Sequence, residues 1–345
     1  MANMRPNANR VIFISLLLLV ISTCAFGAEN PLRAGWLAFA RPALEPAKYP
    51  SSFAQHDARE QAIALLLAAD GKDAVAKESL GYFYLRDYQY YKAKEQFEAA
   101  LKRNSKDPLL HYLLAQTNAI LTATEPEKMS EECKQPIEGF KKAAEREPDN
   151  AMPLLQAASV AFDSGRTDLA LPLVTEALKR SAYHLYKLPM PEDLTDDAGQ
   201  SAAAWWWVQS ELWGEGISRT ANCAHGLRQR GDQLKLNENL SGADELYQQV
   251  SQMGMLISRS EPALTTALAV GLELQRQALE NRIALNTRFN PAEVPALRDN
   301  LAKVQAAQSK LAALKAKLKI PQELNSVPAR MSEQKSVVEA VLAGL

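Results

Sequence analysis

Residues 80–108 carry a pattern of apolar side chains that constrains the fold more than any other feature of the sequence. In LGYFYLRDYQYYKAKEQFEAALKRNSKDP, apolar residues recur every three or four positions, stop near Arg86–Gln89 and resume at Tyr90. Small residues at Gly81 and Ala93 let two helices approach closely. The segment therefore predicts a helical hairpin. The buried stripe of its second helix consists of Phe97, Ala100 and Leu101.

The same pattern recurs twice in the next 80 or so residues. A second pair of helices is predicted over 114–148 and a third over 154–178. Equivalent alanines stand at Ala100, Ala143 and Ala177, so the two spacings are 43 and 34 residues. The polar segment ATEPEKMSE accounts for the longer spacing as a loop within the second pair. We predict three repeated units over residues 74–182.

This pattern resembles the tetratricopeptide repeat (TPR), a helix pair that repeats about every 34 residues. Two positions depart from it: Lys77 stands where a large apolar residue is usual, and Ser105 replaces the terminal proline, with Pro108 three residues later. The resemblance implies helix pairs that stack into a curved solenoid. A generic antiparallel bundle with coincidental spacing is the alternative. The matching residues are Leu80-Gly81, Tyr84, Tyr90, Ala93, Phe97 and Ala100-Leu101.

The predicted fold class is all-α: a TPR-like α-solenoid of about three helix pairs, followed by a helical region with a long coiled-coil-like helix. Only 15 glycines and long stretches of Ala, Leu, Glu, Lys and Gln favour helix over sheet. The predicted parts are an extended segment anchored by Trp36 and Phe39, a repeat region, a proline-containing linker and a C-terminal helical region. Their bounds are 28–55, 56–182, 183–200 and 201–345.

The C-terminal region contains a heptad pattern between Asn290 and Pro321. It begins with an Asn-Pro start signal, and its repeat covers three to four heptads. We expect this helix to pack within its own chain rather than against a second copy. The seam consists of Leu297, Val304, Leu311 and Leu318, with Ala307 and Leu314 between them.

The N-terminus has the features of a secretion signal. MANMRPNANR is basic, VIFISLLLLVI is an apolar run too short to span a bilayer, and STCAFG supplies small residues before a cleavage site after Gly27. The signal peptide is therefore predicted over 1–27, and the mature protein is predicted to be periplasmic or secreted without a transmembrane span. As an alternative, Ile21–Cys24 resembles a bacterial lipoprotein box in which Cys24 carries a lipid anchor, although Thr23 departs from the usual small residue.

The composition and motifs argue against several functions. Lys and Arg (39) almost balance Asp and Glu (40), so no basic surplus predicts nucleic-acid binding. The four histidines and the two remaining cysteines, Cys133 and Cys223, lack metal-site spacing. We expect two buried thiols, with one long-range disulfide as the alternative. No phosphate-binding loop or nucleophile elbow is present, so we predict no catalytic residues, cofactor or metal.

The TPR resemblance implies a concave face, formed by the first helix of each pair, that binds a protein or peptide. Glu78, Tyr82 and Arg86 are spaced by four and share one helix face. The alternatives are that these residues are ordinary solvated surface, or that the N-terminal segment fills the groove. Carried over by position, the groove residues are Glu78, Tyr82, Arg86, Tyr112, Gln116, Ser159 and Asp163.

Four of the five tryptophans fall within nine residues, in WWWVQSELW. At about 100° per residue, Trp205, Trp206 and Trp213 lie on one apolar arc of a helix, whereas Trp207 points to the polar side. Three tryptophans are therefore assigned to the core. We expect Trp207 to be covered by another segment of the protein; a protein partner or a flat ligand such as a sugar are the alternatives.

Three functional hypotheses result. The first is an exported scaffold that mediates protein–protein contacts in the bacterial cell envelope. The second is an extracytoplasmic glycan- or small-ligand-binding protein that uses Trp207 and the nearby Tyr183 or Tyr186 for stacking, as helical glycan-binding lipoproteins with TPR-like cores do. The third is an enzyme with a helical fold, and its active site would have to lie in the C-terminal region.

Overall fold

The computed structural model describes residues 31–49, 51–68, 74–124, 132–191, 200–318 and 327–345. The predicted signal peptide and Cys24 lie outside these ranges. Within them every regular element is helical, which confirms the all-α prediction. The α-helices are α2 (Pro31–Leu44), α3 (Ser52–Ala68), α4 (Ala74–Arg86), α5 (Tyr90–Leu101), α6 (Pro108–Ala123), α8 (Lys134–Arg146), α9 (Met152–Asp163), α10 (Thr167–Ala177), α12 (Gln200–Leu236), α13 (Leu240–Ser258), α14 (Thr265–Phe289), α15 (Val294–Lys315) and α16 (Val327–Leu342), and the 3-10 helix η1 (Pro291–Glu293) precedes α15.

The N-terminal part is helical where an extended segment was predicted over 28–55. Pro31 opens α2, a position at which its missing N–H costs no helical hydrogen bond. The expected anchors do hold this part in place, since Trp36 and Phe39 are fully buried. The ring of Phe39 stacks on Phe83 of α4, with centroids 4.2 Å apart. The prediction failed because the prolines were taken to exclude a helix, whereas Pro31 starts α2 and Pro42 is accommodated within its last turn.

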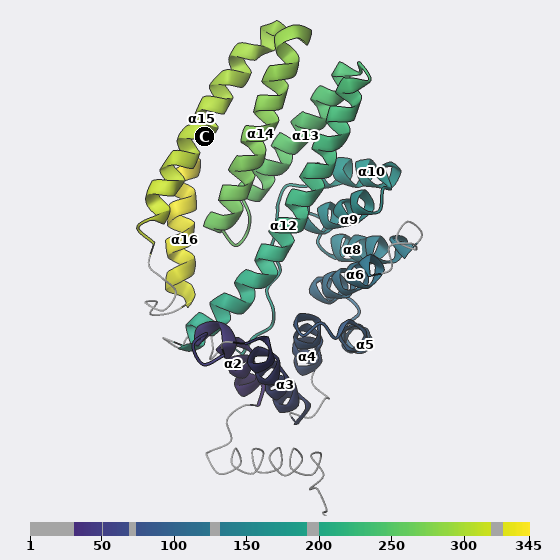
Figure 1. Ribbon diagram of the computed structural model, residues 1–345, viewed down its shortest axis with the longest axis vertical. Coiled ribbons are helices and arrows are strands. Elements are labelled where there is room, and N and C mark those ends of the chain that lie inside the picture. Colours follow the sequence, from purple (N-terminus) through teal and green to yellow (C-terminus); the bar gives the residue numbers. More distant parts are fainter. Residues whose placement is uncertain (1–30, 50, 69–73, 125–131, 192–199, 319–326) are drawn as a thin grey trace, which may run out of the picture.

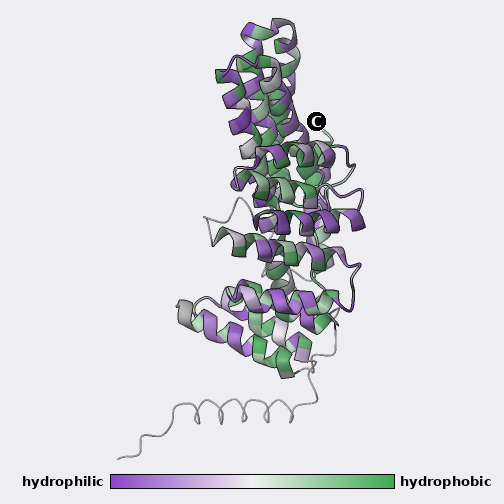
Figure 2. Ribbon diagram, turned by 90° about the vertical axis from the view of Figure 1, so that its right-hand side faces the viewer, coloured by the Kyte–Doolittle hydropathy of each residue, from purple (hydrophilic) through white to green (hydrophobic). Residues whose placement is uncertain are grey.

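Six short helices form three antiparallel pairs at the predicted places: α4 with α5, α6 with α8, and α9 with α10. The close approach in the first pair depends on Gly81, because a Cβ there would lie 2.6 Å from the ring of Phe97. Ala93, Phe97 and Ala100 are fully buried, as the stripe predicts. Viewed from the side, the pairs lie one above another along the long axis (Figure 2).

The longest helix, α12, has 37 residues and connects the two halves of the molecule. It runs obliquely between the stack of short helices and the long C-terminal helices (Figure 1). It packs against α2 and α9 on one side and against α13, α14 and α16 on the other. One apolar core extends from Trp36 through Val208 to Met253. The two predicted regions therefore share a continuous interior.

The C-terminal helices α13, α14, α15 and α16 form a bundle beside α12. The heptad seam packs inside the chain: Leu297, Val304 and Leu311 are buried against α14 and α16. This confirms the expectation of packing within its own chain. The helix ends at Lys315, so Leu318 lies beyond it and the predicted continuation to Pro321 is too long.

Candidate functional site

The concave face predicted to bind a partner is covered by two of the chain's own helices, α2 and α12. Five of its seven predicted residues are buried. A sixth, Arg86, forms ion pairs with Glu211 (2.6 Å) and Glu215 (3.6 Å) of α12, and the seventh, Asp163, stays exposed. The prediction of an open groove is therefore wrong for this chain. The five buried residues are Glu78, Tyr82, Tyr112, Gln116 and Ser159.

Helix α12 lies close to the repeats because small residues face them. A Cβ at Gly226 would lie 2.6 Å from the ring of Phe162 in α9. The side-chain amide of Gln156 donates to the carbonyl oxygen of Gly216 at 2.7 Å and to the Thr220 hydroxyl at 3.0 Å. These contacts give α12 a defined register on α9.

The tryptophan cluster of α12 is covered by helices from both ends of the chain: α2 near the N-terminus and α16 near the C-terminus. The ring of Trp207 lies 6.1 Å from that of Phe39 in α2. The Trp206 ring lies 5.6 Å from the guanidinium of Arg330 in α16, within cation–π range. Cover by the protein itself, the favoured prediction for Trp207, agrees with its contact with Phe39. Trp205 and Trp213 are buried in the core as predicted, but Trp206, which was also assigned to the core, is only half-buried, as Trp207 is.

Residues 183–191, predicted as part of a linker, form an ordered strap between the repeats and α12. The side chain of Gln209 binds the strap at Leu188, accepting from its N–H at 3.1 Å and donating to its carbonyl oxygen at 3.0 Å. Trp213 Nε1 donates to the carbonyl oxygen of Tyr186 at 2.8 Å. The strap also exchanges backbone hydrogen bonds with Glu261 in the loop after α13. The missed signal in the sequence was the high apolar content of YHLYKL, in which Tyr183, Leu185, Tyr186 and Leu188 are all buried.

The strap forms one wall of an open cleft of about 1030 Å³. Its other walls come from α4, the N-terminus of α6, the end of α8, the loop 259–263 and α16. The cleft therefore lies where the repeats meet the C-terminal bundle. The polar residues that line it are Glu78, Asp107, Glu147, His184, Lys187, Arg259, Ser260, Glu261, Ser332, Lys335 and Glu339, together with Tyr186.

Glu78 is the chemically unusual residue of this cleft. Its exposed fraction is only 6%, and its Oε1 atom has no hydrogen-bond partner. Burial, followed by the nearby Asp107 carboxylate, raises the pKa of Glu78 from 4.5 to about 8. The carboxyl is therefore mostly protonated at pH 7. Four other predicted groove residues also keep buried polar atoms without partners: Tyr82, Arg86, Gln116 and Ser159.

Three further polar groups line the cleft beside Glu78, and they differ in how far the protein satisfies them: the Tyr186 hydroxyl, like Glu78 Oε1, is buried without a hydrogen-bond partner. Asp107 caps α6 by accepting from the N–H groups of Leu109 and Leu110. Glu147 accepts from the side-chain amide of Asn150 at 2.8 Å. Burial, and then Glu147 and Tyr112, raise the pKa of the Tyr186 hydroxyl well above its usual value. The inner end of the cleft thus combines three carboxyl groups with one neutral phenol.

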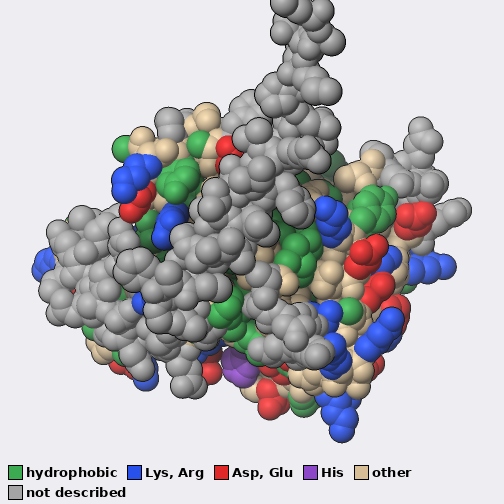
Figure 3. Space-filling view, turned by 90° about the horizontal axis from the view of Figure 1, so that it is seen from below, with side chains coloured by type: hydrophobic (Ala, Val, Ile, Leu, Met, Phe, Trp, Pro, Cys, Tyr) green, Lys and Arg blue, Asp and Glu red, His purple; other side chains and the backbone are tan. Residues whose placement is uncertain are grey.

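The outer part of the cleft carries cations. His184 faces Glu261 at 3.6 Å, and Lys335 faces Glu339 at 3.7 Å. Lys187 and Arg259 line the same region and are exposed. Seen from below, Lys and Arg side chains are interspersed with Asp and Glu among the atoms on view (Figure 3). The charges are therefore mixed in sign.

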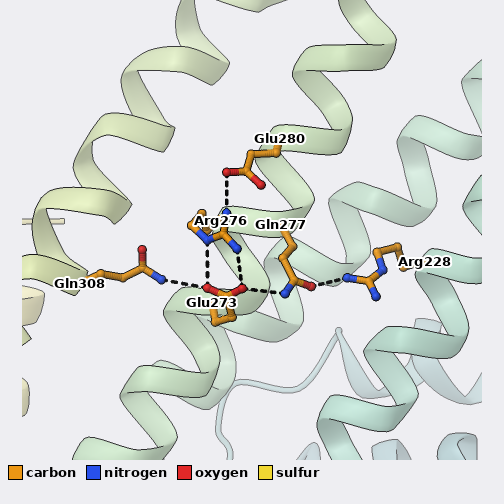
Figure 4. A network of polar contacts seen from close by, with 6 residues as sticks. All are labelled: Arg228, Glu273, Arg276, Gln277, Glu280 and Gln308. Carbon is orange, nitrogen blue, oxygen red and sulfur yellow. Dashed lines mark hydrogen bonds and ion pairs between the residues drawn. The ribbon is translucent and has the colours of Figure 1, made fainter. Parts of the chain in front are cut away.

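A second polar cluster, in the C-terminal bundle, has its hydrogen-bonding groups occupied by one another (Figure 4). Glu273 accepts two hydrogen bonds from Arg276, one from Gln277 at 2.6 Å and one from Gln308 at 3.2 Å. Gln277 in turn accepts from Arg228 of α12. Because its central carboxylate is saturated, this cluster joins α12, α14 and α15 and is not a binding site.

The remaining sequence expectations concern thiols, metals and membrane spans. Cys133 and Cys223 are buried and are not joined by a disulfide. No group of His, Cys, Asp and Glu side chains that could hold a metal occurs among the described residues. In the same part of the chain no helix combines the length and apolarity needed to cross a membrane. Tyr183 is buried, and its hydroxyl lies 2.9 Å from that of Thr220, so it cannot stack on a ligand.

No protein-family model matches the chain. A comparison with curated proteins finds no significant match either.

Proposed function

We propose that the protein is an exported, TPR-like binding scaffold that holds a protein or peptide partner in the cleft between its repeats and its C-terminal bundle. Three helix pairs spaced by 43 and 34 residues support the TPR-like interpretation. The secretion-signal pattern at 1–27 supports export to the periplasm or the cell exterior. Binding without catalysis accords with the sequence, which carries no phosphate loop or nucleophile elbow.

The observation that carries this proposal is the cleft itself, with the nearly buried Glu78 in its wall. Its volume of about 1030 Å³ is at the upper end of ordinary ligand sites. Its walls come from both halves of the chain, so a partner seated there contacts the repeats and the bundle together. The concave face, in contrast, is occupied by α2 and α12 and would have to shed them before it could bind.

The glycan hypothesis loses its main residue in this arrangement. Trp207 packs on Phe39 of α2, and Tyr183 is bonded to Thr220. Tyr186 does line the cleft, so the cleft supplies one aromatic ring rather than a stacking platform. We therefore rank a protein or peptide partner ahead of a sugar.

The cleft is tested by blocking it with a bulky side chain. Ser332 is an exposed residue of α16 that lines the cleft, so Ser332→Trp would obstruct it. Ser336 is exposed one turn further along α16 and is not part of the lining, so Ser336→Trp is the matched control. Each protein, from Ala28 onward, serves as cross-linking bait in a native envelope extract, and the captured proteins are quantified by mass spectrometry.

We expect at least one protein to be captured by the parent chain and by Ser336→Trp but lost with Ser332→Trp. That protein, once purified, should bind the parent chain directly, with a dissociation constant raised roughly tenfold or more by Ser332→Trp. Equal capture by all three baits, or direct binding that ignores Ser332→Trp, would show that the cleft is not the binding site.

Export is tested separately by sequencing the N-terminus of the protein recovered from cells. Simple cleavage predicts a chain that begins at Ala28. The lipoprotein alternative predicts a blocked, lipid-bearing Cys24 as the first residue. Recovery of a chain that starts at Met1 in the cytoplasmic fraction would contradict export.

A further inference from the structure

We propose that the inner end of the cleft binds a positively charged nitrogen, an ammonium or guanidinium group, which donates hydrogen bonds to the carboxyl group of Glu78. This inference rests on the proposed function, because it takes the cleft to be the binding site. Beyond the proposed function, the inference specifies the chemical class of the group that enters the cleft. In a protein partner that group is the end of a lysine or arginine side chain.

The first step of the argument is that Glu78 has a hydrogen-bonding capacity that the chain leaves unused. The residue is 94% buried, and Oε1 has no partner. An unsatisfied polar atom that is shielded from water costs free energy, and the cost is larger when the group is charged. A residue kept in this condition inside the wall of a cleft is suited to a ligand that supplies the missing donor.

The second step is that the charge near Glu78 is negative. Burial and Asp107 are the two influences that shift its pKa, and both act against ionisation. No lysine or arginine among the described residues forms an ion pair with it. Asp107 and Glu147 add negative potential, and their own oxygens already accept hydrogen bonds from Leu109 and Asn150. Of these three residues, Glu78 is the one with a carboxyl oxygen that is buried without a partner, and the field around it attracts a cation.

The third step concerns the orientation of the bound group. An anion at the inner end would face the carboxyl groups of Glu78, Asp107 and Glu147. The lysine and arginine side chains lie on other walls, as Lys187, Arg259 and Lys335, and Lys335 is paired with Glu339. Tyr186 lies among the inner residues as a neutral ring, which also favours a cation. A ligand would enter with its positive end toward Glu78.

Binding of this kind has a measurable proton balance. Before binding, Glu78 is mostly a neutral carboxylic acid at pH 7. A bound ammonium favours the carboxylate, so the O–H bond of Glu78 breaks and its proton leaves to the buffer. The ammonium keeps its own three N–H bonds. About one proton per ligand is therefore released at pH 7.

The test uses the whole mature chain and three probes in titration calorimetry at pH 7. Nα-acetyl-lysine methylamide carries the ammonium, Nα-acetyl-norleucine methylamide is nearly the same size without it, and spermidine represents a free amine. Each titration is repeated in two buffers with different ionisation enthalpies, which gives the number of protons released. The variants are Glu78→Gln, which keeps shape but cannot ionise, and Glu98→Gln, a control at an exposed carboxylate of α5 that does not line the cleft.

We expect the lysine amide to bind with release of about one proton, and the norleucine amide to bind roughly tenfold more weakly or not at all. Glu78→Gln should lose both the affinity and the proton release, while Glu98→Gln keeps them. Equal binding of the lysine and norleucine amides, or binding without proton release, would overturn the inference. A Glu78→Gln protein that binds as the parent does would overturn it as well.

The two proposals fail in different ways. If a partner is captured through the cleft but an excess of lysine amide does not compete with it, the cleft binds protein and the charge inference is wrong. If spermidine binds through Glu78 and the captured partner does not compete with it, the charge inference holds and the partner proposal is wrong. Circular dichroism of Glu78→Gln confirms that the variant is folded before either conclusion is drawn. If it is unfolded, Ser332→Trp replaces it, and lysine-amide binding that survives this block overturns the inference.

Discussion

The two halves of this molecule treat the same side chain in opposite ways. In the repeats, Glu78 is buried with an unpartnered oxygen, and its pKa is raised to about 8. In the C-terminal bundle, Glu273 accepts four hydrogen bonds, and its pKa is lowered to about 2, mainly by Arg276. In the bundle the Glu273 carboxylate joins helices, whereas in the repeats the Glu78 carboxyl keeps an oxygen that bonds to nothing in the protein. A buried polar group that contributes nothing to the fold is the better candidate for a binding role.

Glycines show the same contrast between the halves. In the first repeat pair, Gly81 faces the ring of Phe97, a side chain that can shift. In the bundle, Gly254 and Gly271 face one another, so that a Cβ on either would meet the backbone oxygen of the other. Close contact against a ring tolerates adjustment, but close contact against backbone does not. Replacing a closely packed glycine by alanine should therefore destabilise the protein more in the bundle than in the repeats.

The largest expected effect is a pH dependence caused by Glu78. Because its folded pKa exceeds its unfolded value, the folded state retains a proton that the unfolded state loses between about pH 4.5 and 8. This residue therefore makes the free energy of unfolding fall as the pH rises, by up to about 5 kcal/mol at 1.36 kcal/mol per unit. Glu78→Gln should be nearly as stable as the parent at pH 4 and clearly more stable at pH 8.5.

Urea denaturation of both proteins across this pH range measures the effect, and the quantity to follow is the difference between them. A difference that stays constant with pH would show that Glu78 is not held neutral by its surroundings. Glu339→Gln, on the exposed wall of the cleft, should show no such trend.

The next effect is the cost of adding one methyl group at each glycine contact. Gly271→Ala should lower the free energy of unfolding by about 3 kcal/mol, because backbone atoms oppose the new Cβ. Gly81→Ala should cost about 1 kcal/mol, because the Phe97 ring can move. Gly214 of α12 has open space around it, so Gly214→Ala should be neutral or stabilise by up to about 1 kcal/mol. Urea denaturation ranks the three, and a larger loss at Gly81 than at Gly271 would reverse the contrast drawn between the halves.

A smaller effect is expected where the two halves meet. Arg86→Met keeps the apolar stem of the side chain but removes its ion pairs with Glu211 and Glu215. Because both partners are mostly buried, we expect a loss of about 1–2 kcal/mol that shrinks at high salt. Arg166→Met removes an exposed pair with Asp168 and should change nothing measurable. An Arg86 variant as stable as the parent at low salt would mean that this pair does not hold α12 on the repeats.

The local pattern of apolar residues predicted the helix pairs, but contacts between residues far apart in the sequence determine where the candidate site lies. Gly81 and Phe97 belong to one hairpin, so their spacing was readable from the sequence. The cover over the concave face was not, since it comes from α2 and α12, whose small residues, such as Gly226, signal close packing without naming a partner. Asp107 and Glu147 could not be assigned to a site from the sequence for the same reason. Asp107 is a helix cap and Glu147 an ordinary surface glutamate, and they line a cleft only because the strap 183–191 passes beside them.

The smallest effect, and the one that isolates the bundle, comes from Glu273. Its lowered pKa means that the folded state prefers the carboxylate, so its contribution is complete above about pH 4.5 and is lost as the pH falls toward 2. Since 40% of this side chain is exposed, screening reduces that contribution to about 0.5–1 kcal/mol. Glu273→Gln should therefore be slightly less stable than the parent at pH 7 and equal to it near pH 2, the reverse of Glu78→Gln. Thermal unfolding at both pH values, with Gln308→Ala as a second way to weaken the same cluster, measures it. If Glu273→Gln and Glu78→Gln shifted stability with the same pH trend, the opposite roles assigned to these two carboxyl groups could not both be right.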